Sequence, residues 1–535
     1  MSAVLEARRR WLQQAGALAS STVLPAWMPG ASAQSPSTLN ALPRLALVIG
    51  NGKYIEAPLK NPGNDARGIG GELQKLGFHV NLKLDAGKNE MIEAIRAFGA
   101  ELGRKKGIGM FYYAGHGAQL AWKNYLIPVD AAIEKVEDMQ AKTVELNSVL
   151  DGFINAQNPM NVIILDACRD NPFGNRAQTQ QKGLSQFDAP PGSLLAYATS
   201  PGHTAADGDG ANGLYTENLL RELKVPETRI EDVFKRVRLN VRKKSAGRQI
   251  PWESTSLEDD FYFLPPGQAK TLSEQELDRL FSEELAIWEG VKDAKESAKL
   301  EEFLRRFPSG SFSELAQLQL DNLLKAQGEK RIRVAAQEGN PFTRGSAEAN
   351  TQWQVGDRYI YRRIDLLGVE ATHDAVQTVK EIADGEVRYG NGLITDLLGN
   401  PLRRGGGRTY SPNQIEPLEY VVGKQWVTQF RMTTPKGHSG RNEMKLRIVG
   451  RERITVPAGT FDAFRIEGAG VFEEERGRVE LINTIKWAAP DRLRREVAME
   501  ETRERGGRGG RRGRRGSGAR VGQSLRWELV SFAQK

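Results

Sequence analysis

Cysteine is nearly absent from this chain: its 535 residues contain one, Cys168. A single cysteine cannot form an internal disulfide, so a disulfide-stapled scaffold is excluded. The residue is then a reactive thiol, an intermolecular link or a small buried hydrophobe. Histidine is also scarce, with five residues. Any chemistry that needs a thiol and an imidazole therefore depends on very few side chains.

Long hydrophobic runs are absent too, and no stretch reaches the roughly 18 apolar residues expected of a membrane-spanning helix. The amino terminus has a targeting pattern instead. Three Arg at residues 8–10 precede a mildly apolar run and then Ala31-Ser-Ala33. This order is typical of an export signal peptide, and the Arg pair resembles the twin-arginine type. We expect residues 1–33 to be a signal peptide, residues 34–43 a linker, and the protein to be exported, periplasmic or secreted.

Excess positive charge is confined to one tract. The chain carries a net charge of +8, and residues 503–520 hold eight Arg and one Glu, so the remainder is nearly neutral. Such Arg/Gly-rich composition predicts a disordered insertion. The tract has no aromatic residues to stack on bases, which makes nucleic acid an unfavoured partner. Two interpretations stay open: contact with an anionic envelope surface, or a solvated linker.

Residues 44–263 show the alternation of an α/β domain. Short apolar runs bounded by turn residues predict strands at residues 44–50, 78–84, 108–113, 162–165 and 194–198. Helices are predicted between these strands, among others at 89–102 and 145–156, and two amphipathic helices at 215–223 and 230–243 follow the last strand. We therefore predict a mostly parallel sheet sandwiched by helices.

Two of these strands end in reactive side chains. The strand at 108–113 continues into Ala114-Gly-His116-Gly117, and the strand at 162–165 continues into Asp166-Ala-Cys168. Ligand sites of open α/β sheets lie at the carboxyl ends of the strands. This arrangement suits a cysteine nucleophile and its base. The alternative is a core histidine and a buried cysteine.

The two motifs, Tyr112-Tyr-Ala-Gly-His116-Gly and Asp166-Ala-Cys168-Arg, resemble those of a caspase-type cysteine peptidase of the bacterial metacaspase-like branch. Cys168 lies 52 residues after His116, close to the spacing of about 50 in caspases. The resemblance covers residues 44–263. It implies a caspase-like fold and a Cys–His dyad, with no third member visible in the sequence.

The resemblance also implies roles for individual residues. Cys168 would be the nucleophile and His116 its base, with the backbone N–H groups of Gly117 and Cys168 binding the oxyanion. Asp166 and Asp65 would hold a basic P1 side chain, so that the enzyme cuts after Arg or Lys. For Asp65 a second interpretation stays open, in which it caps the helix that follows it.

The resemblance leaves activation open. We expect no cofactor; calcium activation is known in the family, but no ligand cluster in this sequence supports it. The composition of residues 171–190 predicts a long polar loop. The resemblance implies that this loop can be cut during activation, with Arg176 and Lys182 as candidate cleavage sites. The alternative is a mobile surface loop that is not cut. His203, in the loop after the last strand, is expected to line the cleft without acting in catalysis.

The second half predicts accessory domains. Capping-box patterns at Ser273–Glu276 and Ser311–Glu314 begin amphipathic segments, and residues 264–335 resemble a tetratricopeptide-like helical module. The amphipathic pattern of such a module indicates that its helices pack together, and binding of a protein partner is the weaker inference. Alternating strands and turns over residues 350–535 predict an antiparallel β domain, a sandwich or curved sheet, interrupted by the Arg/Gly-rich tract.

Two functional hypotheses follow. In the first, the chain is an exported cysteine endopeptidase acting on protein or peptide substrates with a basic P1 residue. In the second, the caspase-like domain is a non-catalytic scaffold, and the helical and β modules bind envelope partners. The Cys–His pair and two acids favour the first hypothesis, and the accessory regions favour the second.

Overall fold

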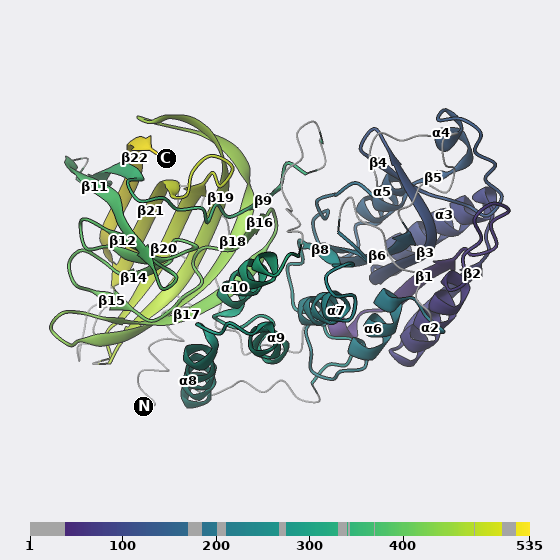
Figure 1. The fold of residues 1–535 in the computed structure, drawn as a ribbon, viewed down its shortest axis with the longest axis horizontal. Coiled ribbons are helices and arrows are strands. Elements are labelled where there is room, and N and C mark those ends of the chain that lie inside the picture. The colour runs from purple at the N-terminus through teal and green to yellow at the C-terminus, as the bar shows by residue number, and fades with distance from the viewer. Residues whose placement is uncertain are drawn as a thin grey trace, which may run out of the picture.

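The computed structural model describes residues 38–168, 184–200, 210–266, 274–329, 340, 343–368, 370–475, 477–505 and 520–535. An α/β domain, a group of helices and an antiparallel β-barrel follow one another along the chain (Figure 1). The expected signal peptide and residues 506–519 of the Arg/Gly-rich tract lie outside the described residues. Within these ranges, no helix is both long and apolar enough to cross a membrane.

The α/β domain is built on one sheet with the strand order β2-β1-β3-β6-β7-β8. Neighbouring strands from β2 to β7 are parallel, and β8 is antiparallel to β7. A small antiparallel extension, β4 and β5, is attached to the far end of β3. The strands are β1 (Arg44–Gly50), β2 (Phe78–Leu84), β3 (Ile108–Leu120), β4 (Lys123–Leu126), β5 (Val144–Glu145), β6 (Met160–Cys168), β7 (Ser193–Tyr197) and β8 (Trp252–Thr255).

Helices cover both faces of this sheet, as its apolar strands require. Side chains alternate along β1: Ala46 and Val48 join one core, and Leu45, Leu47 and Ile49 join the other. The first core includes α2 (Pro62–Lys75), α6 (Leu214–Glu222) and α7 (Ile230–Lys244). The second includes α3 (Lys88–Lys105) and α5 (Leu146–Ala156). The predicted sandwich of a mostly parallel sheet between helices is confirmed.

Two strands are longer than the sequence pattern predicts. β3 continues through His116 to Leu120, and β6 includes Asp166 and Cys168. The small and polar residues of both motifs hide this extension, because apolar periodicity stops at Tyr113 and Leu165. Both motifs are therefore held by the sheet itself and do not lie in loops that follow it.

The helices of the second part are α8 (Glu274–Val291), α9 (Ser297–Arg306) and α10 (Ser313–Ala326). Trp288, Phe303 and Phe312 pack in their shared core. The capping box predicted at Ser311–Glu314 is wrong: the N-cap of α10 is Phe312, without a side-chain hydrogen bond. Glu314 instead pairs with Lys424 at 2.8 Å and accepts from the backbone N–H of Leu418, so its carboxylate satisfies donors of a remote segment.

The antiparallel β domain is confirmed, but its form is a closed barrel rather than a sandwich or an open curved sheet. β10 pairs with β22, from Arg358 opposite Ala533 to Asp365 opposite Leu525, and this contact closes the ring. β18 and β19 span 18 and 16 residues, and a register shift lies between Ile448 and Gly450. Such irregularities let long strands bend and close.

The barrel strands run in ring order, and Figure 1 shows them curving around one interior. A separate two-stranded sheet joins β9 (Ser346–Glu348) to β16 (Glu419–Val421). The ring comprises β10 (Arg358–Asp365), β11 (Glu370–Ala383), β12 (Glu386–Tyr389), β13 (Ile394–Asp396), β14 (Pro401–Arg403), β15 (Thr409–Tyr410), β17 (Gln425–Thr433), β18 (Ser439–Val456), β19 (Gly459–Glu474), β20 (Val479–Ala488), β21 (Glu496–Arg505) and β22 (Arg520–Ala533). The Arg/Gly-rich tract connects β21 to β22.

Candidate active site

The parallel pairing of β3 with β6 brings the two sequence motifs together. In this register Ala114 lies opposite Asp166, and His116 lies opposite Cys168. Adjacent strands are about 4.8 Å apart, so the backbones of the expected base and nucleophile are immediate neighbours. The side chain of Cys168 lies outside the described part of the structure; its backbone position is the last of β6.

The His116 ring is buried, with 5% of the residue exposed. Its Nε2 lies 2.7 Å from the carbonyl oxygen of Ala57. A carbonyl can only accept, so in the neutral ring Nε2 carries the hydrogen and Nδ1 is the basic nitrogen. Ala57 has a φ of 52°, a left-handed conformation uncommon for a residue with a Cβ, and such conformations cluster at functional sites.

Two tyrosines hold the backbone of His116. Its N–H donates to the Tyr54 hydroxyl at 2.9 Å, and its carbonyl accepts from the Tyr113 hydroxyl at 2.8 Å and from the N–H of Ile127 at 3.1 Å. The Tyr54 ring also packs on the imidazole, with 4.4 Å between the ring centroids. Gly115 makes room for both hydroxyls, since a Cβ there would lie 2.6 Å from one and 2.8 Å from the other.

Sequence reasoning missed Tyr54 and Ala57, and the sequence offered no third member of a triad. A backbone carbonyl leaves no residue-type pattern, so the contribution of Ala57 had no signal. Tyr54 follows Gly50-Asn51-Gly52 in the loop after β1, a segment without a catalytic motif. Asn51 is fully buried, and its side chain bonds the N–H of Ala86 at 2.9 Å, which ties this loop to the next one.

Gly117, the expected oxyanion residue, follows His116 in β3 and lies opposite Leu126 of β4. A Cβ at Gly117 would lie 3.0 Å from Leu184 and 3.2 Å from Ala167. The glycine is therefore enclosed between the residue before Cys168 and a side chain from beyond the loop that follows it. This close approach explains why the position is glycine.

The two acids lie around one buried tyrosine. Asp166 is half-buried and accepts from Thr216 Oγ1 at 2.6 Å and from the Tyr112 hydroxyl at 3.4 Å. Burial raises the pKa of Tyr112 well above its ordinary value, and the charges of Asp166 and Asp65 raise it further. Both carboxylates are thus close enough to Tyr112 for their charges to act on the same phenol.

Asp65 does not cap its own helix, and that interpretation is wrong. The N-cap of α2 is Asn61, and it makes no side-chain cap hydrogen bond. Asp65 Oδ1 instead accepts from Asn212 Nδ2 at 2.9 Å and from the N–H of Gly213 at 3.0 Å. Gly213 is the N-cap of α6, so the carboxylate lies at the positive end of a different helix.

Several expected residues fall outside the described residues: Arg176, Lys182 and His203. The end of the predicted 171–190 loop is described, and there the expectation of a polar surface segment is wrong. Leu184, Ser185, Gln186 and Phe187 are all buried. Ser185 bonds through its backbone to Asn124 and through its hydroxyl to Asn340, so a polar sequence here does not mean exposure.

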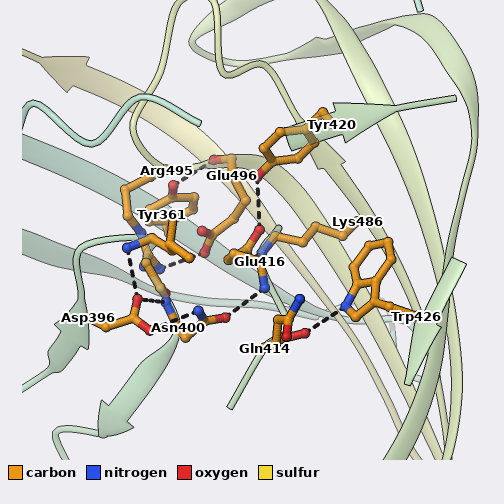
Figure 2. A network of polar contacts seen from close by, with 12 residues as sticks. Tyr361, Asp396, Asn400, Gln414, Glu416, Tyr420, Trp426, Lys486, Arg495 and Glu496 are labelled. Carbon is orange, nitrogen blue, oxygen red and sulfur yellow. Dashed lines mark hydrogen bonds and ion pairs between the residues drawn. The ribbon is translucent and has the colours of Figure 1, made fainter. Parts of the chain in front are cut away.

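The barrel contains a second cluster of buried polar groups, which sequence reasoning did not find (Figure 2). Lys486 forms an ion pair with Glu416, which also accepts from the Tyr420 hydroxyl at 3.1 Å. Burial lowers the pKa of Lys486 to about 8 and raises that of Asp396 to about 7. These residues come from separate strands and loops, so no local spacing reveals them. Each is bonded to its neighbours, which indicates a structural network.

In the described residues, no group of three or more His, Cys, Asp and Glu side chains is arranged to hold a metal ion.

Comparisons with known proteins agree with this geometry. Residues 43–262 match the family model of the caspase domain. The chain is similar to the mouse mucosa-associated lymphoid tissue lymphoma translocation protein 1 homolog, with 28% identity over 244 residues, and to the human protein of that name, with 34% identity over 128 residues. These matches cover 44% and 24% of this chain but only 28% and 15% of the two relatives. The fold, the motif register and the family match together identify residues 43–262 as a caspase domain.

Proposed function

We propose that this caspase domain is a cysteine endopeptidase that cuts after Arg or Lys. The observation that carries the proposal is the strand register that sets His116 opposite Cys168. A thiol and an imidazole on adjacent strands suit proton transfer between them. The Ala57 carbonyl, which orients the imidazole through Nε2, supports the same assignment.

The reaction follows from these groups. His116 Nδ1 takes the proton of the Cys168 thiol, and the sulfur attacks the scissile carbonyl carbon. Backbone N–H groups of Gly117 and Cys168 bind the oxyanion that forms. The C–N bond then breaks, the amine leaves with the proton from His116, and water hydrolyses the thioester. Release of the carboxylic acid restores the thiol.

Basic P1 specificity is proposed from charge. Asp166 is half-buried near the carboxyl end of β6, two residues before the nucleophile, and Asp65 acts on the same tyrosine. A guanidinium or ammonium group entering this region would be attracted, and an acidic side chain would be repelled. The known relatives are matched over a minor part of their length, so this specificity is proposed for this chain from its own residues.

A peptide panel tests the activity. Protein that comprises residues 34–535 is assayed with fluorogenic peptides carrying Arg, Lys or Asp at P1, with and without calcium. We expect turnover at Arg and Lys only, and loss of at least about 10³-fold in kcat for Cys168→Ala and for His116→Ala. Silence of a folded wild-type protein with an unmodified thiol would contradict the peptidase and favour a non-catalytic scaffold.

The acidic pocket has its own test. A hydrogen bond to a charged group contributes about 1.5–3 kcal/mol, so Asp166→Asn should lower kcat/KM for P1 Arg roughly 10- to 100-fold. Asp65 is buried and its Oδ1 already accepts from Asn212 and Gly213, so Asp65→Asn should have a smaller effect on kcat/KM. An unchanged preference for Arg over Asp at P1 in the Asp166 variant would contradict the pocket assignment.

Tyr54 should act by holding the base. Tyr54→Phe keeps the ring but leaves the buried N–H of His116 without its acceptor, at a cost of about 1–3 kcal/mol. We expect a lower melting temperature and a lower kcat with little change in KM. Tyr125→Phe, which alters a buried tyrosine of the adjoining hairpin, is the matched control. Equal losses of kcat in both variants would argue against a specific role for Tyr54.

Export and partners complete the proposal. The pattern in residues 1–33 supports export, the Arg/Gly-rich tract supports contact with an anionic envelope surface, and α8–α10 would contact a protein partner. Expression of the full chain in a bacterium with a twin-arginine pathway should yield periplasmic protein that begins near Gln34, as read by amino-terminal sequencing. Retention of an intact amino terminus in the cytoplasm would contradict the leader.

A further inference from the structure

A short segment joins the caspase domain to the second half of the chain. We call residues 184–189 the anchored segment. On the caspase side, Ser185 N–H donates to Asn124 Oδ1 at 2.6 Å, and Asn124 Nδ2 donates to the Ser185 carbonyl at 2.8 Å. Ala189 N–H donates to Ser254 Oγ of β8 at 3.1 Å. The segment is therefore fixed to both β4 and β8.

The second half of the chain holds the same segment from the other side. Asn340 Nδ2 donates to Ser185 Oγ at 3.0 Å and to the Gln186 carbonyl at 3.3 Å. The Asp188 carboxylate accepts from the N–H of Gly345 at 2.7 Å and from Ser346 Oγ at 2.5 Å. Ser346 begins β9, which Figure 1 shows on the side of the barrel that faces the caspase domain.

These contacts are closely fitted. A Cβ at Gly345 would lie 2.8 Å from Asp188 Oδ2, so only glycine allows the loop to approach the carboxylate. Burial raises the pKa of Asp188, while the hydrogen bonds from Ser346 and Gly345 and the charge of Arg451 lower it. Separating this half-buried carboxylate from its two donors, which come from one segment, would leave it without these hydrogen bonds.

The anchored segment reaches the candidate active site. Leu184 packs against Gly117, the residue after His116, and is part of the same core as Ala167, the residue before Cys168. Asn124 lies in the hairpin that continues from β3, the strand of His116. The chain between Cys168 and Leu184 is also the segment that directly follows the nucleophile. One short stretch thus packs against β3, shares a core with β6 and bonds to the second half of the chain.

We propose that Asn340, Gly345 and Ser346 position the anchored segment, and that Leu184 of this segment in turn positions the strand ends that carry His116 and Cys168. Asp188 and Ser346 are then positioning residues for the proposed peptidase. The second half of the chain is in this view a structural part of the catalytic unit. The inference rests on the proposed function for its kinetic consequence, but the positioning itself can be measured on the thiol alone.

The experiment compares four variants of the mature full-length chain: Asp188→Ala, Asp188→Asn, Ser346→Ala and Arg447→Ala. Asn at 188 can accept from Gly345 and donate to Ser346, so it is the conservative replacement. Arg447→Ala removes the 2.8 Å pair with Glu258, another contact between the two halves that does not involve the anchored segment. Circular dichroism and melting temperatures establish that each variant is folded.

Two readouts are taken. The first is kcat and KM on a P1 Arg peptide. The second is the pH profile of alkylation by iodoacetamide, which reports a single site because Cys168 is the only cysteine. We expect Asp188→Ala and Ser346→Ala to lower kcat about tenfold with KM within twofold, and to shift the alkylation profile to higher pH as the thiolate loses its imidazolium partner. Asp188→Asn should retain most of the wild-type kcat and a nearly wild-type alkylation profile, and Arg447→Ala should match the wild type in both.

Unchanged kcat and alkylation in folded Asp188→Ala and Ser346→Ala would overturn the proposal. A rise in kcat would also overturn it, because the contact would then be inhibitory. If the wild-type protein turns over no peptide, the peptidase proposal fails by itself. The alkylation profiles then still decide the positioning, since a profile that differs from wild type supports it and an identical profile refutes it.

Discussion

The parallel ladder between β3 and β6 is the constraint on which the rest of the site depends. Its register sets Ala114 opposite Asp166 and His116 opposite Cys168, so the motifs are aligned by backbone hydrogen bonds. A shift of one residue would turn every side chain of a strand to the other face. The buried alternation of both strands, which feeds two separate cores, forbids such a shift. Packing of the whole sheet therefore fixes the positions of His116 and Cys168, which lie on two of its central strands.

The surroundings of His116 hold the imidazole in one orientation, as its proposed role in proton transfer requires. The imidazole is oriented by the carbonyl of Ala57, and its backbone is held by Tyr54 and Tyr113. Tyr54 and Tyr113 are buried, whereas Ala57 lies in an exposed part of the loop after β1 and contributes through its carbonyl. A base positioned in this way loses little entropy when substrate binds, which is the physical meaning of preorganisation. This arrangement requires a glycine at position 115, because only a residue without Cβ leaves room for the hydroxyls of Tyr54 and Tyr113.

The sequence predicts what depends on local pattern and fails where the cause is distant. Strands at residues 44–50 and 78–84 have the predicted bounds, since apolar runs between turn residues define them. The continuation of β3 to Leu120 has no apolar pattern and was missed. The helix cap expected of Asp65 and the capping box at Glu314 share one error. In both, a carboxylate near a helix start bonds to a remote segment, which local spacing cannot reveal. Barrel closure between β10 and β22 is non-local in the same sense, because the paired strands lie at opposite ends of the domain.

Hydrogen bonds of buried polar groups explain why the two halves of the chain pack against each other. The 184–189 segment looks like a loop in the sequence, yet its side chains and amides are divided between Asn124 on one side and Asn340, Gly345 and Ser346 on the other. Leaving such groups without partners would cost about 1–3 kcal/mol each, so the two halves stabilise one another through this segment. If the segment positions the candidate active site, as we propose, that site is sensitive to anything that moves the second half of the chain. The barrel has its own buried ion pairs, and in the proposed arrangement it would act on the candidate active site through this segment without contacting substrate.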